Sequence, residues 1–147
     1  TGHDPHLRSK QVPLMSTRPI LDDESASPEA RALFDDIRAK RNTEYVNHFW
    51  RVMAHDPERA AELWQKLQRV MAPGKLDPLV KEMIYVAVSA SNGCSYCVHS
   101  HTAAAKNRGM TDEMHSELLA VIAMAQETNG LANSLQVPVD DCFEAGR

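Results

Sequence analysis

A repeated helix-start signal constrains this chain more than any other feature. Ser or Asp stands directly before proline at Ser27-Pro28, Asp56-Pro57 and Asp77-Pro78. A Ser or Asp side chain can accept hydrogen bonds from the free N–H groups of a first helical turn, and proline suits the first helical position. Each signal is followed by apolar residues three and four positions apart, which is the spacing of one helix face.

These and weaker signals divide the chain into short helical segments. The expected segments are 28–40, 48–53, 57–72, 79–90, 94–108, 112–128 and, as a seventh, a final turn over 131–135. In the third segment the apolar residues expected on the buried side are Ala60, Leu63, Trp64, Leu67 and Val70. Gly109 is expected to end the fifth. Most of the Val and Ile residues lie within these helical patterns, so we predict an all-α fold, a compact bundle of about six to seven helices.

Length and composition set further limits. A chain of 147 residues can bury its own core, and we expect one helical domain over 15–147, preceded by an added or disordered extension over 1–14. The 16 Lys and Arg against 20 Asp and Glu give a net charge of −4. The sequence lacks the basic segments interleaved with aromatic residues that are typical of nucleic-acid binders. The longest apolar run is far shorter than the roughly 20 residues that cross a bilayer. With no signal peptide recognised, we expect a cytoplasmic protein that binds neither nucleic acid nor membranes.

Two of the three cysteines are closely spaced. Cys94 and Cys97 form a Cys-x-x-Cys pair, whereas Cys142 is expected to be a spectator thiol. A close pair in a reducing compartment indicates catalysis, metal binding or redox sensing. At about 100° per residue, Cys94, Cys97 and His101 share a helix face about 60° wide, and His99 lies on the far side. The start of a helix also favours thiolate, the reactive form of cysteine.

Glu82 is the acidic residue expected to join this face. It lies in an otherwise apolar segment, in a polar stripe with Tyr85 and Ser89. If Asn92-Gly93 turns the chain back, Glu82 and His101 lie at similar depths from the turn, because each residue adds about 1.5 Å along a helix. A carboxylate there could orient the imidazole, as orienting groups do for catalytic bases.

This combination resembles a known family. Glu82, eleven residues, Cys94-x-x-Cys97, three residues and His101 are similar to the motif of the alkylhydroperoxidase D-like proteins of the carboxymuconolactone decarboxylase-like superfamily. The resemblance covers about 61–125, the expected redox core. One difference is Tyr96, which stands where the best-known member has histidine.

The resemblance implies a thiol-dependent peroxidase that assembles as a trimer or hexamer. Cys97 would attack the hydroperoxide, Cys94 would form the disulfide with it, and Glu82 with His101 would relay the proton. A thiol or dithiol reductant protein would restore the dithiol. No cofactor or metal ion is expected.

Other functions remain open at this point. The same dithiol would serve a disulfide reductase or thiol relay. A zinc-binding helical protein could use Cys94, Cys97 and His101 with Glu82 as the fourth ligand. In a helical interaction module without chemistry, the cysteines would only pack. Tyr96 and His99 could line a substrate pocket or simply pack.

Overall fold

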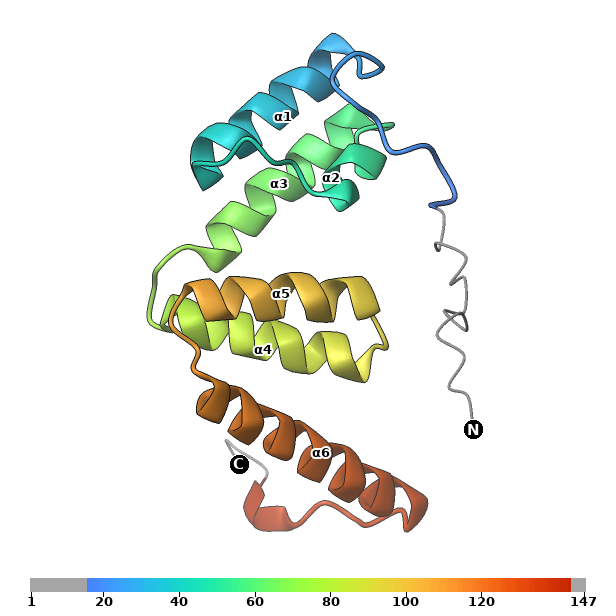
Figure 1. Cartoon of the computed structure of the whole chain (residues 1–147). Coiled ribbons are helices and arrows are strands. Elements are labelled where there is room, and N and C mark those ends of the chain that lie inside the picture. Colours follow the sequence, from blue (N-terminus) through green and yellow to red (C-terminus); the bar gives the residue numbers. More distant parts are fainter. Residues whose placement is uncertain (1–15, 144–147) are drawn as a thin grey trace, which may run out of the picture. The chain divides into compact units, whose positions relative to one another are not determined.

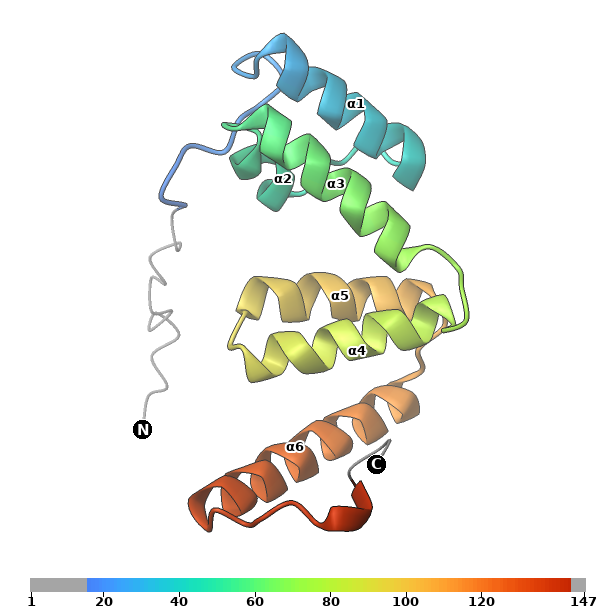
Figure 2. The ribbon, with the colours of Figure 1, turned by 180° about the vertical axis from the view of Figure 1, so that it is seen from behind.

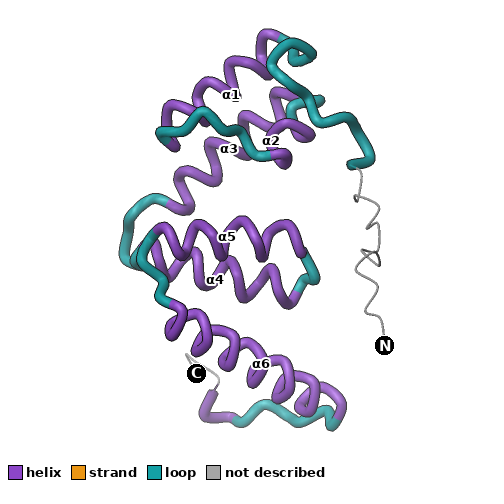
Figure 3. Tube along the Cα trace, in the orientation of Figure 1, coloured by secondary structure: helices purple, strands orange, loops and turns teal. Residues whose placement is uncertain are grey.

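The structure, a computed structural model, describes residues 16–143, so the extension expected over 1–14 lies outside the described residues. Helices and loops make up this part of the chain, and no strand occurs in it (Figure 3). The elements in chain order are α1 (Pro28–Arg41), α2 (His48–Met53), α3 (Pro57–Met71), α4 (Pro78–Ser91), α5 (Ser95–Asn107), α6 (Asp112–Ser134) and the short 3-10 helix η1 (Asp141–Phe143) (Figure 1). The predicted all-α class and the approximate helix count are confirmed.

The chain packs as two compact units that divide after Arg69, within α3. That a single domain covers 15–147 stays a prediction. The first unit holds α1, α2 and most of α3 around a core of buried side chains, namely Ala26, Ala30, Leu33, Phe34, Ile37, Val46, Trp50, Ala54, Ala60 and Trp64. The Ser27 hydroxyl accepts a hydrogen bond from the Ala30 N–H at 3.2 Å, as the helix-start signal predicts.

Polar contacts tie the elements of this first unit together. Asp23, ahead of α1, accepts hydrogen bonds from Arg38 at 2.7 Å and from Arg51 at 3.1 Å. Partial burial alone would raise the pKa of Asp23, but these two guanidinium groups outweigh it and lower the pKa. The indole of Trp64 donates to Asp36 at 2.7 Å, and this hydrogen bond lowers the pKa of the Asp36 carboxyl.

The buried face of α3 is narrower than predicted. Ala60 and Trp64 are buried, whereas Leu63 is 37% exposed and Val70 is 56% exposed. Leu63 and Val70 lie along one edge of the apolar stripe, about 60–80° from Ala60 around the helix axis. The packing of the small first unit covers only the centre of that stripe.

The second unit consists of α4, α5 and α6 with the segments around them. Its core comprises Val86, Ala105, Met110 and Leu118, against which Leu79, Met83, Met114 and Ile122 pack. Helices α4 and α5 run side by side in opposite directions in both views (Figures 1 and 2), and α6 also contacts α4. Helix α6 continues through Asn129-Gly130, so no separate turn forms over 131–135.

Helix α4 buries two polar side chains beside Val86 and exposes several apolar ones. Glu82 is 5% exposed and Ser89 is 4% exposed, while Ile84 and Val88 are 48% and 53% exposed. This distribution is the reverse of the usual preference of carboxylates for water and of aliphatic side chains for the interior. The side of α4 that faces its neighbours therefore carries a polar site.

Within the described residues, no helix combines the length and apolar character that crossing a membrane requires.

Candidate functional site

The turn between α4 and α5 positions the first cysteine. Gly93 adopts a left-handed φ of 68°, which lets the chain leave α4 abruptly. The Gly93 N–H donates to the Ala90 carbonyl at 3.2 Å, and the Cys94 N–H donates to the Ser89 carbonyl at 3.0 Å. These two bonds form a Schellman motif that ends α4. Cys94 is at once the last residue of that motif and the N-cap of α5.

The two cysteines of the motif are joined by a disulfide across the first turn of α5. The Cys94 Sγ also accepts a hydrogen bond from the Cys97 N–H at 3.3 Å, as an N-cap side chain does. Cys94 thus stands just before the helix rather than within its first turn, because the Schellman motif already uses its backbone N–H. Cys97 lies in the first turn, at the positive end of the helix dipole.

The expected proximity of Glu82 and His101 is observed. The His101 Nδ1 lies 2.7 Å from the Glu82 Oε2, and the Glu82 side chain is only 6% exposed. An ionised Glu82 can only accept, and in that state Nδ1 is the ring nitrogen that carries a proton and donates. His101 then presents Nε2 as the ring nitrogen that can accept a proton. The contact has the geometry that the hypothesis of an orienting carboxylate and a base requires.

A tyrosine fixes the plane of the same imidazole. The rings of Tyr85 and His101 stack with their centroids 3.5 Å apart and their planes 16° apart. Tyr85 comes one helical turn after Glu82 on α4, so one helix supplies both the carboxylate and the stacking ring. The polar stripe of α4 is therefore part of the site's construction, and Tyr85 has a specific position in it.

Arg108 is a member of the site that the sequence analysis did not single out. Its Nε lies 3.4 Å from the Glu82 Oε1, so each carboxylate oxygen faces a different donor. The signal was present in the spacing, because Arg108 follows His101 by seven residues and two helical turns bring it to the same face of α5. From sequence alone, however, a positive charge at the C-terminal end of a helix is explained by the helix dipole without any further partner.

The other candidate residues are exposed. His99 is exposed, as its place on the far side of the helix predicts, and Tyr96 is 44% exposed. Cys142 is a free, exposed cysteine in η1. Within residues 16–143, no group of three or more His, Cys, Asp or Glu side chains could hold a metal ion. The ligand set considered for zinc therefore does not assemble in the described part of the chain.

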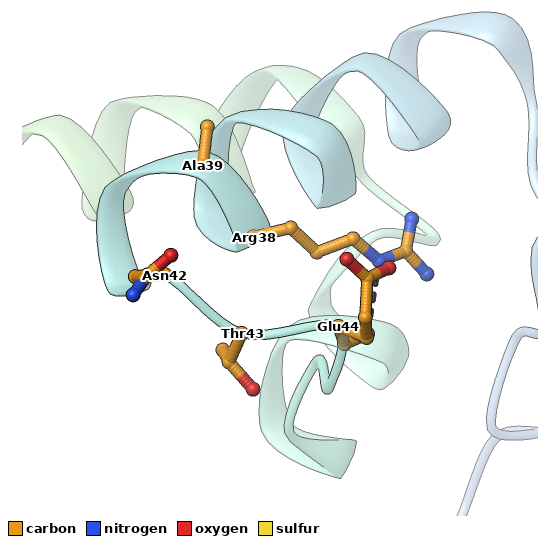
Figure 4. A pocket seen from close by; sticks show the side chains of 5 residues that line it. All are labelled: Arg38, Ala39, Asn42, Thr43 and Glu44. Atoms are coloured by element: carbon orange, nitrogen blue, oxygen red, sulfur yellow. Dashed lines mark hydrogen bonds between the residues drawn. The ribbon is translucent and has the colours of Figure 1, made fainter.

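The described part of the chain has a surface hollow in each of its two units. A groove of about 370 Å³ in the second unit is lined by Val70, Met71, Leu76, Lys81, Ile84, Tyr85 and Val88. Tyr85 thus borders an apolar groove and also stacks on His101. A hollow of about 320 Å³ in the first unit lies where α1 ends (Figure 4). There the Arg38 Nε donates to the Glu44 carbonyl at 3.0 Å, which is an ordinary contact that closes a loop.

Comparisons with known proteins agree with this geometry. The sequence profile of the carboxymuconolactone decarboxylase family matches residues 57–140, more than half of the chain. The chain belongs to the carboxymuconolactone decarboxylase family. The match includes the whole of the α4–α5 hairpin and the whole of α6.

Relatives within this family carry the alkylhydroperoxidase description. The chain is 34% identical over 91 residues to the alkyl hydroperoxide reductase AhpD of Solibacter usitatus, which corresponds to 62% of this chain and 50% of that protein. It is 50% identical to the crystal structure of the alkylhydroperoxidase AhpD core from Rhodospirillum rubrum, with a TM-score of 0.86 over 90% of this chain and 99% of that one. The chain spans half the length of the Solibacter reductase. The predicted resemblance to the alkylhydroperoxidase D-like proteins is confirmed.

Proposed function

We propose that this chain is a thiol-dependent peroxidase that reduces hydroperoxides by cycling Cys94 and Cys97 between dithiol and disulfide. The observation that carries the proposal is the 2.7 Å contact between the His101 Nδ1 and the buried Glu82, on the same hairpin as the cysteine pair. Similarity to proteins described as alkylhydroperoxidases supports the same activity. The cytoplasmic location expected from the sequence stays a prediction.

In the proposed cycle, His101 first accepts the thiol proton of Cys97 at Nε2. The Cys97 thiolate attacks one peroxide oxygen, the O–O bond breaks, and the proton passes from His101 to the departing alkoxide, which leaves as an alcohol. Cys97 is then a sulfenic acid. The Cys94 sulfur attacks the Cys97 sulfur, the disulfide forms, and water leaves. A partner thiol or dithiol protein returns two electrons and two protons to the disulfide.

The geometry of α5 supports this division of labour. Cys97 lies inside the first turn, where backbone N–H groups and the helix dipole favour a thiolate, whereas Cys94 lies just outside the helix. These features favour Cys97 as the attacking thiol and Cys94 as the resolving one.

Rapid mixing of the fully reduced protein with hydrogen peroxide and with tert-butyl hydroperoxide tests the proposal. Cys142→Ser should serve as the background, because it removes the third thiol from the count. We expect one disulfide per chain, between Cys94 and Cys97, to form much faster than the oxidation of a free thiol. Cys97→Ser should abolish peroxide consumption, whereas Cys94→Ser should leave a sulfenic acid that a dimedone probe traps.

The opposite results separate the proposal from its nearest alternative. Oxidation no faster than that of a free thiol contradicts a peroxidase. If the protein instead reduces a disulfide substrate rapidly and reacts only slowly with peroxides, it is a thiol relay that uses the same cysteines. A Cys97→Ser variant that retains full peroxide consumption would rule out the proposed nucleophile.

We also propose that the chain assembles as a trimer or hexamer, as the family resemblance implies. An apolar stripe on α6 supports this assembly. Its large side chains, each more than half exposed, are Val121, Met124, Leu131 and Leu135. They lie within about 80° of one another around the helix, in the three-and-four spacing of helix–helix contacts. Exposed stripes of this kind mark interaction surfaces.

Analytical ultracentrifugation of the full chain tests this assembly. Leu131→Glu places a charge in the centre of the stripe and should lower the oligomer mass toward that of one chain. Gln126→Glu adds the same charge on the opposite side of α6, at an exposed position, and should leave the mass unchanged. A monomeric parent protein at micromolar concentration would contradict the assembly.

A further inference from the structure

We infer that Arg108 is a positioning residue of the peroxidase site, which supplies the charge that balances Glu82 and thereby frees His101 to act as a base. This inference rests on the proposed function. The two oxygens of Glu82 are divided between two donors, with Oε2 at 2.7 Å from the His101 Nδ1 and Oε1 at 3.4 Å from the Arg108 Nε. No other hydrogen-bond or ion-pair partner of Glu82 is found among the described residues.

The burial of Glu82 makes this second donor necessary. A carboxylate that is 6% exposed has lost most of its hydration, so it needs hydrogen bonds and a compensating positive charge. An arginine side chain is charged at every working pH, whereas an imidazole is not. With Arg108 beside Glu82, the balancing charge does not have to come from His101. The imidazole can then keep Nε2 unprotonated and ready to accept the Cys97 proton.

The end of α5 is built so that Arg108 reaches Glu82. Arg108 is the C-cap, and Gly109 follows with a φ of 100°, a conformation that side chains disfavour. The Gly109 N–H donates to the Lys106 carbonyl and the Met110 N–H to the Ala105 carbonyl, both at 3.0 Å, which completes a Schellman motif. Ala105 and Met110 are both in the buried core, so the helix end is anchored there.

The neighbouring cation has a different partner, which makes it a matched control. Lys106 lies two residues earlier at the same helix end and pairs with Asp112 at 3.0 Å rather than with Glu82. Both cations lie at the end of α5, where a positive charge interacts favourably with the helix dipole. Lys106→Met therefore removes one positive charge from this end of α5 without touching the carboxylate. An effect of Arg108→Met that Lys106→Met does not reproduce is specific to Glu82.

Stopped-flow oxidation of the reduced protein by tert-butyl hydroperoxide, in the Cys142→Ser background, is the first test. Arg108→Met should slow disulfide formation about tenfold, on the scale of one lost hydrogen bond to a charged group. Arg108→Lys keeps the charge and should stay within about threefold of the parent, and Lys106→Met within about twofold. In a Glu82→Gln background, Arg108→Met should add less than about twofold, because its partner charge is already gone.

Two results would overturn the inference while leaving the peroxidase intact. One is equal slowing by Arg108→Met in the parent and in the Glu82→Gln background, and the other is equal slowing by Arg108→Met and Lys106→Met. Thermal melts accompany each variant, and Arg108→Lys provides the comparison if Arg108→Met melts below the assay temperature.

A second measurement does not depend on peroxidase activity. The His101 Nδ1 proton, held by Glu82, should give a slowly exchanging imidazole resonance in nuclear magnetic resonance spectra. Its exchange with water should become about tenfold faster in Arg108→Met and stay unchanged in Lys106→Met. This measurement tests the positioning role of Arg108 even if the protein is not a peroxidase. Identical exchange rates in the parent, Arg108→Met and Lys106→Met would refute that role.

Discussion

Replacing Glu82 by glutamine tests the donor arrangement of the site most directly. The amide has the shape of the carboxylate but carries one oxygen and one NH₂ group. If the oxygen faces the His101 Nδ1, the NH₂ group faces the Arg108 Nε–H, and two donors oppose each other. If the amide flips, its NH₂ group faces Nδ1, so the imidazole must carry its proton on Nε2. In that tautomer His101 cannot accept a proton from Cys97.

The size of the effect follows from the contacts that are lost. The first orientation loses the hydrogen bond from Arg108, and the flipped one replaces the bond between His101 and a charged carboxylate by a bond to a neutral amide. A hydrogen bond to a charged group is worth about 1.5–3 kcal/mol, and the Glu82 side chain is shielded from water. If that loss falls on the transition state, disulfide formation slows about 10- to 100-fold. The assay is acid quenching of the reduced protein after mixing with hydroperoxide, with free and bonded cysteines counted by mass spectrometry.

A matched variant controls for the loss of a negative charge. Glu117 is an exposed glutamate on α6 in the same unit, so Glu117→Gln should leave the oxidation rate unchanged. A Glu82→Gln protein that folds normally and forms its disulfide at the parental rate would refute the relay. The His101–Glu82 contact would then be structural.

Three further predictions concern stability. Phe34 is fully buried in the first unit, so Phe34→Ala should lower the free energy of unfolding in urea by about 3–5 kcal/mol; a loss under about 1 kcal/mol would mean that this core is not closely packed. Gly109 has a φ of 100°, so Gly109→Ala should cost about 1–2 kcal/mol in the same measurement, and no loss would contradict the left-handed turn. Arg38 and Arg51 lower the pKa of Asp23, so this carboxylate stabilises the fold above its unfolded-state pKa, and the contribution disappears as the pH falls through the lower folded-state pKa. Below about pH 4, the urea midpoint of unfolding should therefore change less with pH in Asp23→Asn than in the parent protein. The same pH dependence in both proteins would contradict the ion pair.

Much of the local structure could be predicted from the sequence because it depends on near neighbours. The starts of α1 and α4 follow from Ser27 and Asp77, whose side chains accept hydrogen bonds from nearby backbone N–H groups, and Gly109 ends α5 as expected. The face shared by Cys94 and His101 follows from helix periodicity. The contact between Glu82 and His101 could also be predicted, because a tight turn joins their two helices and brings residues at similar depths together.

The features that sequence reasoning missed depend on packing between elements. Most side chains of α4 are apolar, so their spacing does not indicate which side of the helix is buried. In the structure the side with Glu82 is buried, and Ile84 and Val88 are exposed. The pairing of Arg108 with Glu82 depends on packing too, because the two residues lie on different helices. The division of the chain after Arg69 falls within a continuous helix, where composition does not change.

The Schellman turn at Gly93 also has a consequence for how the site comes into existence. The residues of the site all lie in one helical hairpin, made of α4, α5, the short connection over 92–94 and the C-cap of α5. They are Glu82, Cys94, Cys97, His101 and Arg108. Contacts between residues so close in sequence cost little loop-closure entropy and form early in folding. A ribosome-bound chain that has emerged as far as Gly109 already exposes every residue of the site, and it can assemble the hairpin before α6 emerges.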